Sequence, residues 1–227
     1  SLNGVSYPYG IHDCDDLEGL MDNSTMFFGS QGEPDGSLQL PVGVAASLPA
    51  GIDIVHEVHY VNTTMEPVKV YSRVNAYTIA QDAVEKGIWG GQVRDEHIQI
   101  PASGEHTEWT RCVMNEDVEV LFVASHTHRR GVRFTVAPYD GTTVGEIFYE
   151  NTDWHSPKIV QYEQPMKLKA GQGFEYRCTW RNNDPTAVQY GLNAEDEMCN
   201  LTLVHTPFSQ SAECTVVETS DGVLWRR

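Results

Sequence analysis

The chain has 227 residues, 40% of them hydrophobic, and carries 32 acidic against 15 basic side chains for a formal net charge of −17. That charge disfavours nucleic acid or an anionic membrane as a partner and suits a soluble protein with a solvated acidic surface. The sequence holds no apolar run of the roughly 18 residues that a membrane span needs, and it does not begin with a signal peptide. Its length allows one large or two small domains.

The first part of the sequence combines loop with two predicted strands. Residues 1–37 are rich in Gly, Asp, Asn, Ser and Pro, which indicates loop. Two later stretches alternate apolar and polar residues, and we predict strands at 52–61 and 68–79. Residues 81–91 indicate a linker or a short helix. We therefore place a domain boundary there, between a first module at residues 1–82 and a second module at residues 83–227.

The second part repeats the β pattern at short intervals. Strands are predicted at 93–100, 118–123, 133–138, 145–149, 174–180 and 201–206, with turns such as Tyr139-Asp140-Gly141 between them. Short strands at this spacing, with hardly any helical periodicity, indicate an all-β fold built as an antiparallel β-sandwich or jelly roll.

A short internal echo links the two parts. Leu48-Pro49-Ala50-Gly51 precedes the predicted strand at 52–61, and Leu168-Lys169-Ala170-Gly171 lies 120 residues later (168 − 48) before the strand at 174–180. This offset favours two copies of one module in tandem. A common pattern of turn followed by strand is the alternative explanation of so short a match.

Two histidines are candidate metal ligands. His126 and His128 follow the strand predicted at 118–123, and residues i and i+2 of a strand lie on one face. Two neutral imidazoles held in this way are half of a metal site, although an exposed polar face would show the same pattern.

His126-Thr127-His128, followed later in the chain by Glu197-Met198-Cys199, resembles the copper type II, ascorbate-dependent monooxygenases, a family that includes the peptidyl-glycine α-hydroxylating and dopamine β-monooxygenases. The resemblance extends over most of the chain from about Phe28 onward. It implies that His126, His128 and Met198 bind an oxygen-activating copper, that ascorbate supplies the electrons and that a substrate C–H bond is hydroxylated. The thioether of Met198 is a soft ligand that favours Cu(I). Core packing is the alternative role for this methionine.

The same family has a second copper, bound by a His-His pair and a third histidine in a later His-Tyr strand. His59 matches the third ligand, but the sequence contains no His-His pair. His56 and His59 would face opposite sides of a strand, so they do not replace the pair. We therefore expect an incomplete first module, completed by a missing N-terminal segment or a partner chain, and one copper per chain. The opposing possibility is that His12, His56 and His59 converge through loops.

The five cysteines show no Cys-x-x-Cys spacing, which disfavours zinc and thioredoxin-type chemistry. Four of them lie near predicted strand ends in the second part, as expected of a disulfide framework from an oxidising compartment. The resemblance implies the pairs Cys178–Cys199, which would brace Met198, and Cys112–Cys214, which would tie the C-terminal segment to the strand before the His pair. It leaves Cys14 without a partner inside this chain.

Three positions bear on the substrate. The peptide-amidating branch of the family holds its substrate carboxylate with an arginine and a tyrosine, where this chain has Ala124 and Thr202, although Asn200 is kept. A peptidyl-glycine substrate is therefore disfavoured. Arg129 and Arg130 could attract an anionic substrate or pair with the acidic residues 195–197.

Two functions remain open from the sequence. One is a secreted, periplasmic or cell-surface copper monooxygenase, for which the acidic composition and the departures from the animal enzymes favour a bacterial source. The other is a copper-binding or purely structural β-sandwich in a larger extracellular assembly. An upstream segment with a His-His pair would favour the enzyme.

Overall fold

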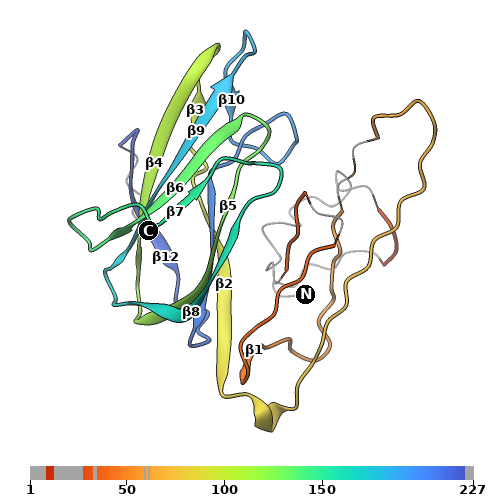
Figure 1. The fold of residues 1–227 in the computed structure, drawn as a ribbon, viewed down its shortest axis with the longest axis vertical. Helices are drawn as coiled ribbons and strands as arrows, with labels where there is room; N and C mark the ends of the chain where they lie inside the picture. The colour runs from red at the N-terminus through yellow and green to blue at the C-terminus, as the bar shows by residue number, and fades with distance from the viewer. Residues whose placement is uncertain (1–8, 13–27, 33–34, 59, 61, 223–227) are drawn as a thin grey trace.

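The computed structural model describes residues 9–12, 28–32, 35–58, 60 and 62–222, and Figure 1 shows its fold. Strands provide the regular structure of these residues, apart from one 3-10 turn at Gln81–Ala83. Within the described part, no helix is long and apolar enough to cross a membrane. The chain is all-β with antiparallel sheets, as predicted, and among the strands of the described part β1 alone pairs in parallel with its neighbour.

Two five-stranded sheets form the body of the molecule (Figure 1). In spatial order, the first sheet contains β1 (Val44–Ala46), β2 (Lys86–Arg94), β11 (Asn200–Thr206), β5 (Val118–His126) and β8 (Ile159–Leu168). The second contains β12 (Cys214–Thr219), β4 (Gly104–Met114), β9 (Gly173–Asn182), β6 (Gly131–Tyr139) and β7 (Tyr149–Asn151). A two-stranded ladder joins β3 (Gln99–Ile100) and β10 (Val188–Gln189).

The hydrophobic core lies between the two sheets, as expected of a β-sandwich. β5 and β11 supply aliphatic side chains from one sheet, among them Val120 and Leu201, which are fully buried. β9 supplies Phe174, Tyr176 and Trp180 from the other, all with no exposed surface. Burial of such side chains contributes about 1.5–3 kcal/mol each, so the alternation of these strands accounts for the sandwich.

Both predicted disulfides are confirmed. Cys112 of β4 pairs with Cys214 of β12, an adjacent strand of the same sheet. Cys178 of β9 pairs with Cys199, which immediately precedes β11. Because β9 and β11 belong to different sheets, the second bridge ties the two layers together next to Met198.

The strands predicted at 118–123, 133–138, 174–180 and 201–206 lie within β5, β6, β9 and β11. Two other predictions need correction. The stretch 93–100 is not one strand, because Asp95 turns the chain after β2 by accepting hydrogen bonds from the His97 N–H and the Thr110 hydroxyl. Of 145–149, only Tyr149 belongs to a strand.

The predicted linker at 81–91 also needs correction, because its second half belongs to β2. Gly90 lies in this second half. A Cβ at this position would lie 2.6 Å from the carbonyl oxygen of Leu203 in β11, so the glycine allows the close approach of two paired strands.

The first module differs most from expectation. The described residues of 52–61 and 68–79 form no strand, so that prediction is wrong for them. Among the described residues before Lys86, regular structure is limited to β1 and the 3-10 turn. Apolar alternation alone does not make a strand, since a strand is stable only when a neighbour pairs with it and covers one face. The large apolar side chains here are instead exposed: Ile54, Val55, Val58, Tyr60, Val68, Val70, Tyr71, Val74, Tyr77 and Ile79.

The internal echo is present as a turn but not as a module. Gly51 and Gly171 both have positive φ, 78° and 86° respectively, so the two Leu-x-Ala-Gly stretches form similar turns. Only the second leads into a strand, β9. The tandem arrangement of two sandwiches and the boundary between 82 and 83 stay predictions.

Candidate metal centre

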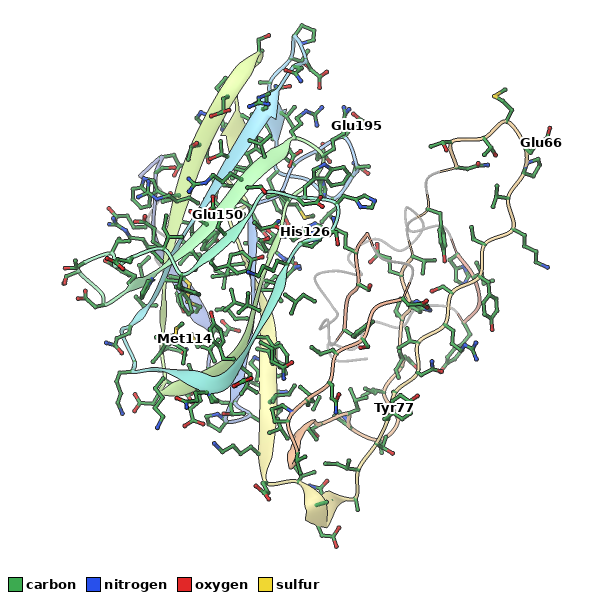
Figure 2. All side chains as sticks on the ribbon, viewed as in Figure 1. Glu66, Tyr77, Met114, His126, Glu150 and Glu195 are labelled. Carbon is green, nitrogen blue, oxygen red and sulfur yellow. A yellow bond between two sulfur atoms is a disulfide. The ribbon has the colours of Figure 1, made fainter. Side chains whose placement is uncertain are left out.

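The two candidate histidines lie together at the end of β5. His126 is the last residue of the strand and His128 lies just beyond it, with ring centroids 5.3 Å apart and the ring planes nearly perpendicular. The prediction that the two rings are neighbours is therefore confirmed, although only His126 is on the strand. Figure 2 shows His126 on the side of the sandwich that faces the N-terminal segment.

A buried carboxylate shapes the chain around His128. Glu197 has no exposed surface, and its two oxygens accept hydrogen bonds from the backbone N–H groups of His128 (3.0 Å) and Arg130 (2.7 Å). Burial raises the pKa of Glu197 above its usual range, and these hydrogen bonds partly offset the rise. Glu197 immediately precedes Met198, so its hydrogen bonds connect the loop after β5 to the segment that carries Met198.

Each ring uses Nδ1 in a hydrogen bond. Nδ1 of His128 is 3.0 Å from the backbone carbonyl of Asp196, and a carbonyl only accepts, so this nitrogen carries the proton. Nδ1 of His126 is 2.9 Å from Oε1 of Gln31. A histidine that is fixed through one nitrogen in this way presents the other, Nε2, to a metal.

His126 is held in the neutral form that metal binding requires. Burial, together with the electrostatic effects of the neighbouring His128 and Arg94, lowers its pKa to about 4. Arg94, Asn200 and His126 are cross-strand neighbours on β2, β11 and β5. At neutral pH the imidazole is therefore uncharged and has a lone pair to donate.

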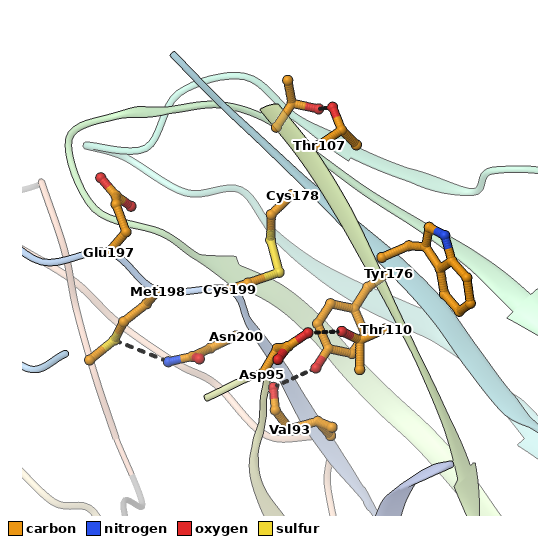
Figure 3. Close-up of a disulfide and its surroundings, with 12 residues drawn as sticks. Val93, Asp95, Thr107, Thr110, Tyr176, Cys178, Glu197, Met198, Cys199 and Asn200 are labelled. Atoms are coloured by element: carbon orange, nitrogen blue, oxygen red, sulfur yellow. Dashed lines mark hydrogen bonds between the residues drawn. A yellow bond between two sulfur atoms is a disulfide. The ribbon is translucent and has the colours of Figure 1, made fainter. Parts of the chain in front are cut away.

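Met198 lies in a polar setting outside the sandwich core. Its side chain is 8% exposed, and Sδ accepts a hydrogen bond from Nδ2 of Asn200 at 3.2 Å (Figure 3). Asn200 is the cross-strand partner of His126, and directly paired residues face the same side of a sheet. Met198 is absent from the hydrophobic cluster that the described residues form between the sheets. Met198 is thus buried, but outside that cluster.

The candidate donor set comprises two imidazoles and one thioether. Among the described residues, no group of three or more His, Cys, Asp or Glu side chains could hold a metal ion. Zinc prefers such groups, whereas thioether sulfur with imidazole suits copper, Cu(I) in particular. In the described part, Oδ1 of Asn200 is buried without a hydrogen-bond partner beside this set. The residues present thus fit copper and leave one polar atom for a bound molecule.

These donors on an antiparallel β-sandwich are of the kind that copper proteins use. A family model described as the C-terminal domain of copper type II ascorbate-dependent monooxygenases matches residues 90–226. The match covers more than half of the chain, and the chain therefore belongs to this family.

The remaining candidates lie elsewhere. His59 and Cys14 are outside the described residues. The ring of His12 contacts the carbonyl of Tyr9, and the ring of His56 contacts the hydroxyl of Ser72. Gln31 was not among the predicted site residues, because it lies in a segment expected to be loop.

Arg129 and Arg130 form ion pairs, which was one of the two roles considered for them. Arg129 pairs with Glu195 at 2.5 Å, and Arg130 pairs with Asp184 at 2.5 Å. Arg130 also donates to the backbone carbonyl of Glu195. The pairing with Asp184 was not anticipated, because Asp184 lies outside the acidic stretch 195–197.

Proposed function

We propose that the chain binds one copper ion through Nε2 of His126, Nε2 of His128 and Sδ of Met198, and that this is the catalytic site of a monooxygenase. The observation that carries the proposal is the pair of imidazoles at the end of β5, each hydrogen-bonded through Nδ1. The membership of residues 90–226 in the monooxygenase family supports it.

When bound, copper would supply the activation of dioxygen for hydroxylation of a substrate C–H bond, with ascorbate as the source of electrons. The protein's own residues would hold and orient the metal for this chemistry. The neutral imidazoles donate lone pairs, and the thioether favours the reduced metal. Glu197 holds the backbone of His128, and Asn200 orients the thioether through its amide. Oδ1 of Asn200 would accept a hydrogen bond from a bound water or substrate.

Replacement of Met198 tests the ligand set. Met198→Leu conserves volume and apolarity but removes the sulfur, so the fold should be kept. We expect Cu(I) affinity to fall by at least about tenfold, the lower end of what even indirect partners of a ligand contribute. Cu(II) affinity should change less. Competition titrations with chelators specific for each oxidation state measure both.

Met65→Leu is the matched control, because Met65 is fully exposed. If copper bound weakly to a surface thioether, Met65→Leu would lower the Cu(I) affinity. Unchanged Cu(I) affinity in Met198→Leu would remove Met198 from the site.

Copper stoichiometry tests the second metal. The chain has no His-His pair, so we expect one tightly bound copper per chain and the same value for His59→Ala. Metal analysis after gel filtration measures it. Two copper ions per chain, with one lost in His59→Ala, would show that a second site forms in this chain alone.

The two disulfides fit an oxidising compartment, and we propose a secreted, periplasmic or cell-surface location on that ground. The exposed apolar side chains between residues 54 and 79 support the expectation that further polypeptide completes the first module.

A further inference from the structure

One amide side chain connects the N-terminal segment to the proposed metal ligand. Oε1 of Gln31 is 2.9 Å from Nδ1 of His126, and Nε2 of Gln31 donates to the backbone carbonyl of Trp154 at 2.7 Å. Gln31 lies 95 positions from His126 in the sequence and 123 from Trp154. Its side chain thus bridges the end of β5 and the loop that contains Trp154.

The two hydrogen bonds together assign the proton on His126. The carbonyl of Trp154 can only accept, so the NH₂ group of Gln31 must face it. The carbonyl oxygen of the same amide then faces His126, and it too can only accept. Nδ1 of His126 therefore carries the proton, and Nε2 carries the lone pair. If the amide were reversed, the Gln31 oxygen would face the carbonyl oxygen of Trp154, and the hydrogen bond between these two residues would be lost.

The loop that receives Gln31 has a defined shape. Oδ1 of Asp153 accepts hydrogen bonds from the backbone N–H groups of His155 (3.0 Å) and Ser156 (3.3 Å). Gly32 has φ of +80°, and a Cβ there would lie 2.1 Å from the carbonyl oxygen of His155. Only glycine allows the chain to pass so close, and this contact sets the position of Gln31.

We infer that Gln31 is a positioning residue for His126: it selects the tautomer protonated at Nδ1 and so presents Nε2 to the metal. The consequence for copper rests on the proposed function, whereas the tautomer does not. A hydrogen-bond partner behind a ligand histidine fixes the orientation of the ring, and its loss typically weakens metal binding about 10–100-fold. The N-terminal segment would thereby tune the metal site of the second module.

The first test uses the metal-free chain. Two-bond proton–nitrogen NMR correlations distinguish the two tautomers of each neutral histidine. We expect His126 to be protonated at Nδ1 in the wild type and to become a mixture of tautomers in Gln31→Leu. His128 serves as the internal reference, since its partner is the backbone carbonyl of Asp196 and should hold it unchanged.

Gln161→Leu is the matched control. Gln161 also donates from its amide to a backbone carbonyl across the two parts of the chain, that of Gln39, but no contact to a histidine accompanies it. This variant removes a docking hydrogen bond without touching the site, and His126 should keep its tautomer. Gly32→Ala is a second variant, which keeps the amide but displaces it, and should behave as Gln31→Leu does.

The second test measures copper. Gln31→Leu and Gly32→Ala should bind copper about tenfold or more weakly than the wild type, with altered electron paramagnetic resonance of the Cu(II) form, and Gln161→Leu should not. A wild-type His126 protonated at Nε2, or an equal effect of Gln161→Leu, would overturn the inference. If the tautomers behave as expected but the wild type binds no copper, the proposed copper site fails while the assignment of Gln31 stands.

Discussion

Replacing Glu197 with alanine is expected to destabilise the protein by about 1–6 kcal/mol, because it leaves one buried and one partly buried N–H group without an acceptor, and an unsatisfied buried group costs about 1–3 kcal/mol. These are the N–H groups of His128 and Arg130, from which the buried carboxylate accepts hydrogen bonds. The melting temperature of a chain this size should fall by roughly 2–4 °C for each kcal/mol. Calorimetry of the metal-free protein measures the change.

The same substitution should weaken copper binding, because the backbone of His128 loses its support. Glu197→Gln keeps one acceptor oxygen and should show a smaller loss of both stability and affinity. Glu195→Ala is the control within the same loop. Its carboxylate is mostly exposed and pairs with Arg129 at the surface, so its removal should change stability by less than about 1 kcal/mol. Equal effects of Glu195→Ala and Glu197→Ala would contradict this account.

Removal of the two disulfides should separate stability from metal binding. The Cys112–Cys214 bridge spans 102 residues and the Cys178–Cys199 bridge spans 21. On the chain-entropy model, closing these loops is worth about 5 and 3 kcal/mol. Replacing Cys112 and Cys214 together by alanine should therefore cause the larger loss of stability, measured by urea unfolding.

Copper affinity should follow the opposite order. Cys199 is adjacent to Met198, so the pair Cys178→Ala and Cys199→Ala frees the chain that positions the thioether, and Cu(I) binding should weaken. The variant without Cys112–Cys214 should bind copper as the wild type does, at temperatures where it is folded. Each variant thus controls for the other. A weaker metal site in the Cys112–Cys214 variant alone would refute the assignment of the two roles.

The sequence predicted best where a local pattern is sufficient. β5 is recognisable because Val118, Val120 and Val123 all point into one core, and the His pair follows it directly. β4 was missed for a physical reason: its inward positions include Glu108 and Thr110, which are buried but polar. β8 was missed because its charged and amide residues, together with Pro165, interrupt the alternation of apolar and polar residues that predicts a strand.

The contacts that shape the site depend on long-range geometry. Gln31 reaches His126 across 95 positions, and Glu197 reaches His128 across 69. A glutamine in a glycine-rich loop and a glutamate in an acidic run carry no local sign of such roles. The predicted strands at 52–61 and 68–79 failed for the converse reason, since alternation is local while pairing requires a partner strand.

The exposed apolar side chains between residues 54 and 79 also govern how the protein behaves in solution. Molecules with a net charge of −17 repel one another at low ionic strength, which opposes contact between these surfaces. At 0.1 M salt the screening length falls to about 10 Å, and apolar contact between copies becomes easier. Copper titrations at low salt therefore report on single chains. Added salt favours self-association, and aggregation would then interfere with the measurement of copper binding.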